Sequence, residues 1–232
     1  MESEMITYSI CFPYCLRLNL LKNTLESFRE QYSYRRDFEI CIAEDPNNAK
    51  EHIQFLNLIK EYHDLTIITK IGSHRGICYL WNLSVEISHG KYTIITSPEV
   101  KPECDILQYL DDAFSQLPQS YQVIAVQNID ASGNHLSWYQ HSKLHNRQLH
   151  FCAAMSRENW TKLGGMDVDF DAGICYDDDM FLHNIKKAGI QIVCTDTVWA
   201  SHQAHSHLNW DNRRSILVAK NKQLFQRKTK HV

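Results

Sequence analysis

Apolar and polar residues alternate along the first hundred positions in blocks that predict strands and helices in turn. Short apolar runs with the length of buried strands occupy residues 8–12, 38–43, 65–68 and 92–96. After the first run, which we expect Pro13 to end, apolar side chains recur at spacings of three and four, at Leu18, Leu21, Leu25 and Phe28. A second helical stretch is expected over residues 76–88. This order predicts an α/β fold with a mostly parallel central sheet flanked by helices.

The second half of the chain has a less regular pattern. Apolar runs predict further strands at residues 123–126, 151–155 and 190–193. A helix is expected after Tyr176, with Phe181, Ile185 and Ala188 on one face. The His- and Gln-rich stretch 135–150 is expected to be a surface excursion, and the basic tail 213–230 to be helical. We find no repeat or linker, so we expect one domain over residues 1–232.

Composition places the chain among soluble globular proteins. It has 232 residues, of which 44% are hydrophobic and 22% charged, and a formal net charge of -3. A mildly acidic chain lacks the field that drives non-specific nucleic-acid or membrane binding. The basic tail favours nucleic-acid association, but such a charge run is more often a solvated helix face. No apolar run reaches the ~18 residues of a membrane span and the opening residues do not resemble a signal peptide, so we expect a cytoplasmic protein.

The cysteines do not have the spacing of a metal finger or a disulfide framework. There are eight, with no CxxC pair, at positions 11, 15, 41, 78, 104, 152, 175 and 194. Most stand inside apolar runs, where a thiol behaves as a small core hydrophobe. We therefore expect reduced, structural cysteines.

Polar residues that follow the predicted strands mark a candidate ligand site, because ligands of open parallel sheets bind beyond the carboxyl ends of the strands. Glu44 and Asp45 are either turn carboxylates or contacts to a nucleotide base or ribose. The sequence has no GxGxxG and no P-loop motif, so phosphates would need a metal and an arginine. Arg75, ahead of a helix start, is either that arginine or a solvated loop residue.

Two denser clusters lie in the second half. Asp177, Asp178 and Asp179 either form a solvated helix N-terminus or hold one carboxylate beside a cleft as a general base. His202, His205 and His207 are either part of a polar loop or metal ligands that need a carboxylate partner. Glu99, which follows the strand at 92–96, is the natural candidate for that partner.

Taken in order, these positions resemble the GT-A fold of nucleotide-sugar glycosyltransferases, in particular family 2. Phe12-Pro13-Tyr14 is similar to the turn after the first strand of that family, and Glu44-Asp45 to its paired acidic motif. The second acid of that motif contacts the base in the family, which implies this role for Asp45. Residues 76–82 follow the family frame that ends in Asn82, with Leu80-Trp81 in place of Ala-Arg.

The resemblance continues through the metal and base motifs. Residues 90–95 resemble the strand that precedes the Asp-x-Asp metal motif of the family. At the position of that motif this sequence has Ser97-Pro98-Glu99, which keeps one carboxylate. This implies Glu99 as a metal ligand, with a late histidine, His202 or else His205, completing the site. Residues 164–167 are similar to Gly-Gly-Phe-Asp, and residues 221–225 to a late Asn-x-x-Leu-Phe motif. Aligning residues 176–178 on Tyr-Glu-Asp implies Asp178 as the catalytic base, and aligning on an Asp-Asp-Asp run implies Asp177.

The resemblance therefore implies an inverting glycosyltransferase that uses Mn²⁺ or Mg²⁺. Its donor is expected to be a nucleoside diphosphate sugar, with UDP the first expected nucleotide, and its acceptor a hydroxyl group. The implied donor-binding residues are Pro13, Tyr14, Asp45, Arg75 and Asn82, and the implied substrate-binding residues are Gly165 and Asp167. Residues 1–100 would form the nucleotide-sugar half and residues 101–232 the acceptor half. The alternative is a GT-A-like binding module that has lost catalysis.

Overall fold

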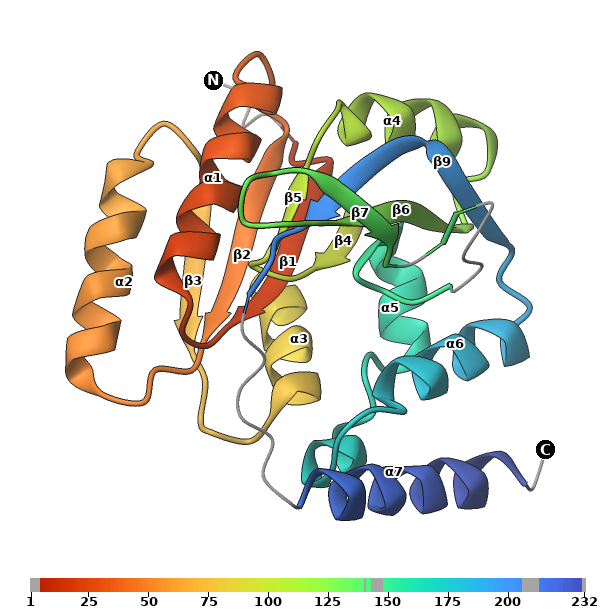
Figure 1. The fold of residues 1–232 in the computed structure, drawn as a ribbon. Helices are drawn as coiled ribbons and strands as arrows, with labels where there is room; N and C mark the ends of the chain where they lie inside the picture. The colour runs from red at the N-terminus through yellow and green to blue at the C-terminus, as the bar shows by residue number, and fades with distance from the viewer. Residues whose placement is uncertain (1–4, 140, 143–147, 206–212, 231–232) are drawn as a thin grey trace.

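The computed structural model describes residues 5–139, 141–142, 148–205 and 213–230, in which strands and helices alternate (Figure 1). The elements of the first half are β1 (Tyr8–Tyr14), α1 (Leu18–Tyr32), β2 (Phe38–Glu44), α2 (Ala49–Glu61), β3 (Ile67–Ile71), α3 (Ile77–Glu86), β4 (Tyr92–Thr96) and β5 (Val100–Pro102). The elements of the second half are α4 (Ile106–Gln116), β6 (Tyr121–Ile129), β7 (His135–Trp138), β8 (Cys152–Ser156), α5 (Arg157–Leu163), the 3₁₀ helix η1 (Val168–Ala172), α6 (Asp177–Lys187), β9 (Ile192–His202) and α7 (Arg214–Thr229).

Within the described residues, nine strands form one sheet in the order β3-β2-β1-β4-β8-β6-β9-β5, with β7 paired to β6. Strands β3, β2, β1 and β4 are parallel, and β8 pairs antiparallel with β4 to begin a mixed half. Only residues 97–99 separate β4 from β5 in the chain, although β5 lies at the far end of the strand order. The sheet therefore curls, and the ends of β4, β5 and β9 come together (Figure 1).

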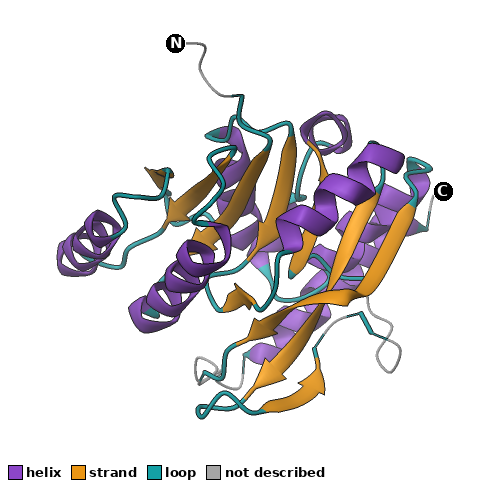
Figure 2. Cartoon of the chain, turned by 90° about the horizontal axis from the view of Figure 1, so that it is seen from above, coloured by secondary structure: helices purple, strands orange, loops and turns teal. Residues whose placement is uncertain are grey.

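Helices cover both faces of this sheet, as Figure 2 shows. Alternate strand residues point to opposite faces: Ile10 and Ile40 pack with α1, α2 and α4, whereas Cys11 and Cys41 pack with α3, α5 and α6. Strands β1, β2 and β4 are buried at every residue. Burial on both faces explains why these strands read as continuous apolar runs and not as alternating ones.

The predicted α/β fold with a largely parallel first half is confirmed, with three corrections to its elements. Pro13 does not end the first strand: β1 pairs with β4 only as far as Cys11, so the missing N–H of Pro13 is not needed there. The third strand is shifted to Ile67–Ile71, because it is an edge strand whose last residues are exposed and tolerate Lys70. The expected surface excursion at 135–150 includes β7, which extends the sheet beside β6.

Helices α2 and α4 and the short strand β5 are absent from the sequence-based pattern. Both helices carry a side-chain cap, since the side chain of Asn48 accepts from the N–H of Glu51 and that of Asp105 from the N–H of Gln108. The tail is helical as predicted, and α7 packs on η1.

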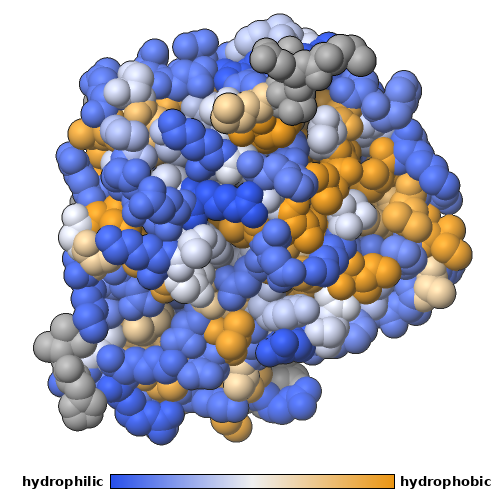
Figure 3. All heavy atoms as spheres, turned by 180° about the vertical axis from the view of Figure 1, so that it is seen from behind, coloured by the Kyte–Doolittle hydropathy of each residue, from blue (hydrophilic) through white to orange (hydrophobic). Residues whose placement is uncertain are grey.

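Polar side chains cover most of the face seen from behind, with apolar ones gathered toward one side (Figure 3). Four of the eight cysteines are buried, as expected for core thiols, but Cys15 and Cys175 are exposed. Within the described part of the chain, every helix is too short or too polar to cross a membrane.

Candidate active site

Glu99, His202 and His205 converge at the point where the sheet curls. Their possible ligand atoms all lie within 4.8 Å of one another. Strand pairing produces this proximity, because Val100 of β5 is the register partner of His202 in β9, which places Glu99 beside the histidine. His207 lies outside the described residues. The structure thus brings together the carboxylate and both alternative histidines of the implied metal site.

Gln203 fixes this cluster to the rest of the fold. Its backbone N–H donates to the carbonyl of Glu99 at 2.9 Å, and its buried amide bridges the carbonyl of Leu20 and the hydroxyl of Thr24 in α1. The carbonyl of Gln203 accepts from His205 Nδ1 at 3.0 Å, so Nδ1 carries the proton and Nε2 the lone pair. The His205 ring is therefore oriented as a metal ligand requires.

The donor set of Glu99, His202 and His205 fits a divalent cation. One carboxylate and two imidazoles are hard to borderline ligands, which suit Mn²⁺ better than a soft metal. Ser97, at the position of the missing first acid, is 6% exposed, and its hydroxyl has no hydrogen-bond partner in the described structure. Such an orphaned oxygen beside Glu99 is consistent with a ligand at this place.

Arg17 is a site residue that sequence reasoning missed. Its Nη1 lies 3.3 Å from Glu99 Oε1, and both side chains are largely buried. Arg17 and the preceding Leu16 have positive φ angles of 66° and 64°, a conformation that is unfavourable for side chains of this size. This strained turn between β1 and α1 directs a guanidinium toward Glu99 in the cluster with His202 and His205.

The residues expected at the base-binding end divide into an accessible and a buried group. Asp45 follows β2, and its Oδ1 accepts from the backbone N–H of His74 and lies 3.0 Å from the His74 ring. Its neighbour Glu44 is buried against His52 instead. Pro13 lies within β1, and Tyr14 is 6% exposed and stacks on Phe55 with ring centroids 4.9 Å apart. Pro13 and Tyr14 thus position the β1–α1 turn, and their contact with a donor stays a prediction.

The remaining predicted binding residues have well-defined partners. The guanidinium of Arg75 is exposed and lies over the ring of Tyr79 at 4.6 Å. The side-chain amide of Asn82 makes two hydrogen bonds to the backbone of Met166, both at 2.8 Å. Its NH₂ group donates to the carbonyl of Met166, and its oxygen accepts from the N–H of Met166. Gly165 has a φ of 71°, and a Cβ there would come within 2.4 Å of Asn82 Oδ1. The structure accordingly gives Asn82 and Gly165 a bracing role between α3 and the loop that follows α5.

Asp167 faces the C-terminal helix. Its Oδ2 lies 2.6 Å from Lys228 Nζ, and its Oδ1 accepts from the N–H of Asp169. Lys228 also contacts Asp169 at 2.7 Å. This ion-pair network ties α7 to η1, and substrate binding by Asp167 and Gly165 stays a prediction.

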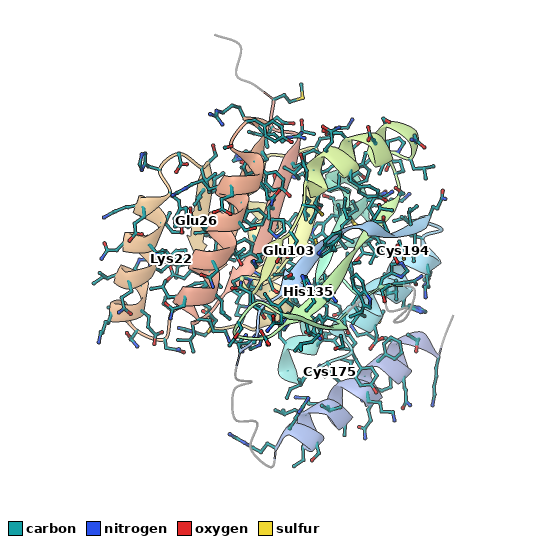
Figure 4. The ribbon with its side chains drawn as sticks, turned by 45° about the horizontal axis from the view of Figure 1, so that its top comes forward. Lys22, Glu26, Glu103, His135, Cys175 and Cys194 are labelled. Carbon is teal, nitrogen blue, oxygen red and sulfur yellow. The ribbon has the colours of Figure 1, made fainter. Side chains whose placement is uncertain are left out.

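The acid cluster opens helix α6, after a strained turn. Cys175 and Tyr176 have φ angles of 62° and 66°. Asn221 of α7, which is 1% exposed, holds this turn by donating to the carbonyls of Phe170 and Cys175 at 2.9 Å. Cys175 lies next to α7 in Figure 4. The late Asn motif of the sequence is thus the support that presents Asp177 and its neighbours.

Asp177 has the electrostatics of a general base. Its burial and the negative charge of Asp178 raise the pKa of Asp177 to about 7. Asp178 Oδ1 accepts from the backbone N–H of Asp179 at 2.8 Å, so part of its carboxylate is engaged locally. A pKa near 7 is matched to proton transfer at neutral pH, which makes Asp177 a candidate general base.

A pocket of about 760 Å³ lies at the acid cluster, and it is lined by Asp177, Asp178, Asp179, Trp81, Tyr139 and His150 among others. Tyr139 connects it to the metal cluster, because its ring stacks on His202 with centroids 4.3 Å apart. Trp81, which stands where the family frame has Arg, donates its indole N–H to the carbonyl of Thr96 at the end of β4. Tyr139 therefore contacts the histidine cluster and also lines the pocket at the acid cluster.

Comparison with known proteins identifies the class of this fold. The chain aligns with S. aureus TarS bound to UDP-GlcNAc, with a TM-score of 0.69, 11% identity and coverage of 89% of this chain and 61% of that chain. It aligns with GalNAc-T7 bound to UDP, GalNAc and Mn²⁺, with a TM-score of 0.69, 13% identity and coverage of 97% and 50%. It aligns with the Pyrobaculum calidifontis mannosyltransferase PcManGT in complex with GDP-Man and Mn²⁺, with a TM-score of 0.66 and 14% identity. That alignment covers 96% of this chain and 64% of that chain.

The chain therefore has the GT-A fold of nucleotide-sugar glycosyltransferases. It spans between 50% and 64% of the length of these three solved chains. No protein-family model and no curated protein sequence matches it.

Proposed function

We propose that this chain is an inverting, divalent-metal-dependent glycosyltransferase that moves a sugar from a nucleoside diphosphate sugar to an acceptor hydroxyl. The observation that carries the proposal is the pair of clusters, Glu99 with His202 and His205 and the aspartates that begin with Asp177, with Tyr139 in contact with His202 and in the lining of the pocket at Asp177. The fold, which the chain shares with solved glycosyltransferases, supports it independently.

The donor is proposed to lie beyond the ends of β1, β2 and β4, in the half formed by residues 1–100. Asp45 would accept from a base N–H or a ribose hydroxyl, and Arg17 and Arg75 would offer guanidinium groups to the diphosphate. TarS and GalNAc-T7 were solved with UDP-GlcNAc or UDP and PcManGT with GDP-Man, which supports this donor class. UDP-sugars are the first donors to test.

Glu99, His202 and His205 are proposed to hold Mn²⁺ or Mg²⁺, which when bound supplies positive charge to the leaving diphosphate. The structures of GalNAc-T7 and PcManGT contain Mn²⁺, which supports this choice of ion. Arg17 already offsets part of the negative charge of Glu99 from the other side.

Asp177 is proposed to take the proton from the acceptor hydroxyl as that oxygen attacks the anomeric carbon. The attack comes from the face opposite to the departing diphosphate, so the anomeric configuration inverts, and a single displacement needs only one base. Burial and, after it, the charge of Asp178 raise the pKa of Asp177 to about 7, and the pocket around both is lined by residues of the proposed acceptor half, 101–232, together with Ile77 and Trp81.

Ligand-induced stabilisation tests the donor and metal assignments together. We expect at least one nucleotide sugar to raise the melting temperature in Mn²⁺, because a ligand of the folded state stabilises it by mass action. Chelator should remove this shift, and so should Glu99→Gln, whereas Glu103→Gln, outside the cluster, is the matched control. Donor binding unchanged by chelator and by Glu99→Gln would refute the metal role of Glu99. Saturable donor binding without nucleotide release would instead indicate a binding module.

A further inference from the structure

His150 is a buried polar side chain whose place in the structure its local contacts do not explain. It is 2% exposed, and neither ring nitrogen has a hydrogen-bond partner in the described structure. Its neighbours are aromatic: Trp81 lies edge-on with centroids 4.4 Å apart, and Phe151 is stacked at 5.7 Å. Burying two polar atoms without partners destabilises a fold, so their retention indicates a partner that arrives with a ligand.

The ring lines the same pocket as Asp177. The lining of the pocket combines aromatic and aliphatic side chains, which include Trp81, Tyr139, Phe151, Phe170 and Leu217, with carboxylates. Its volume of about 760 Å³ is within the range of small-molecule sites. Trp81 is held in place by its bond to Thr96, so the aromatic wall is formed before a ligand binds.

The chemistry of His150 narrows the class of ligand. Burial lowers the pKa of His150 to about 3, so the ring is neutral at working pH and offers one N–H donor and one lone-pair acceptor. An ammonium ion can only donate and a phosphate can only accept, whereas a hydroxyl group does both. A ligand that carries several hydroxyls can satisfy both ring nitrogens.

The charge of the pocket lining narrows the class of ligand further. The lining holds four carboxylates, Asp171 and Asp177 to Asp179, against one guanidinium, that of Arg214. Such a pocket repels a phosphorylated or otherwise anionic acceptor. An uncharged pyranose, which presents an apolar C–H face to aromatic rings and hydroxyls at its edge, matches both the aromatic and the polar side chains of this lining.

We infer that this pocket binds the acceptor, that the acceptor is an uncharged saccharide, and that His150 is the residue that recognises its hydroxyls. That the ligand is the acceptor rests on the proposed function. The class of ligand rests on His150 and its aromatic surroundings. Hydroxyl-bearing peptides and sugar phosphates are the competing ligands.

Direct binding tests the inference. Methyl glycosides of glucose, galactose, mannose and N-acetylglucosamine are titrated into the full chain with Mn²⁺ and nucleoside diphosphate, followed by saturation-transfer NMR. Glucose 6-phosphate and a Ser/Thr peptide are titrated in parallel. We expect a neutral glycoside to bind, and His150→Phe to weaken it by about tenfold or more, since an unpaired hydroxyl is strongly rejected. His150→Gln, which keeps a donor and an acceptor, should restore most of the binding, and the exposed His63→Gln should change nothing.

Stability supplies a second readout that a purely structural histidine would not give. His150→Phe should raise the melting temperature while it weakens glycoside binding, because it removes two unsatisfied polar atoms from the interior. Equal glycoside binding by wild type and His150→Phe would overturn the inference. So would the absence of binding by every neutral glycoside, or binding of the phosphate or peptide in its place. Donor titration of the wild-type chain in the same buffer separates this failure from failure of the proposed function, which shows as no nucleotide-sugar binding.

Discussion

The two ends of the site are built in opposite ways. Glu99 and His202 are brought together by strand register, and their supports, such as Gln203, make several hydrogen bonds to the core. Asp177, in contrast, carries a raised pKa and shares its pocket with His150, whose ring nitrogens have no hydrogen-bond partner in the described structure. Both ends contain a turn with positive φ angles, but the first end is organised by strand register, whereas the second holds a buried carboxylate with a raised pKa, a combination that is common where groups must react.

Removing the base should have the largest effect. Asp177→Asn is expected to lower kcat by about 10³-fold, because a positioned general base contributes that order of acceleration, and to leave donor affinity nearly unchanged. Initial rates of nucleotide release against donor concentration separate the two constants. Asp179→Asn, an exposed neighbour, is the matched control and should stay within a few fold. Loss of activity in the control alone would move the base to Asp179.

Removing the proposed metal ion or its ligand Glu99 should have the next largest effect. Chelation, or Glu99→Gln, is expected to reduce turnover by about 10²-fold, since charge stabilisation of the leaving diphosphate contributes several kcal/mol. Added Mn²⁺ should rescue the chelated wild type but not the variant. Turnover that survives in chelator would show that Arg17 and Arg75 supply the charge alone.

The support of the strained turn should show in stability as well as rate. Asn221→Ala removes two hydrogen bonds and is expected to cost about 1–3 kcal/mol of unfolding free energy, since buried carbonyls lose their partners. Turnover should fall with it. Gln223→Ala, exposed on the same helix, is the control, and urea unfolding measures both. An unchanged urea midpoint for Asn221→Ala would contradict the role of Asn221 in holding this turn.

Arg17 should matter for the donor more than for the fold. Arg17→Met is expected to raise donor KM by about tenfold, because a charge-assisted bond to phosphate is lost. Relief of the ion pair with Glu99 should leave metal affinity equal or higher. The comparison is with Lys22→Met, which removes an exposed charge from α1. Equal KM values for the two variants would exclude Arg17 from donor binding.

The smallest effect concerns pH. Asp178→Asn is expected to move the acid limb of the rate profile to lower pH, because the charge that helps to raise the pKa of Asp177 is removed. The sign for stability is fixed by the same shift: since folding raises the pKa of Asp177, its contribution to stability is present at low pH and is lost as pH rises through about 7. Asp177→Asn should therefore raise the melting temperature at pH 8 more than at pH 4.

The parallel half could be predicted from sequence because its signals are local. The runs at β1, β2 and β4 and the spacing in α1 suffice to place the strand ends, and therefore Asp45 and Glu99. Helix α2 escapes prediction because Asn48, its cap, sits in a turn-rich stretch that reads only as a strand stop. Strand β5 has three residues, too few for a pattern.

The acid end could be located but not understood from sequence. The three aspartates are visible in any reading, but the choice of Asp177 depends on its burial, which only the folded chain shows. Arg17 reaches Glu99 across 82 positions and Asn221 reaches Cys175 across 46. The sequence around His150 does not single it out either, because its significance lies in the hydrogen bonds that its ring nitrogens lack in the described structure. Contacts of this kind are properties of the tertiary structure.

Release of nucleoside diphosphate, measured for the wild type, Glu99→Gln and Asp177→Asn across a panel of UDP- and GDP-sugars in Mn²⁺, tests most directly whether the two ends form one transferase site. We predict release from at least one donor by the wild type and its loss in each variant separately, with donor still bound by Asp177→Asn. Saturable binding without release from any donor, or release that neither substitution changes, would contradict the account.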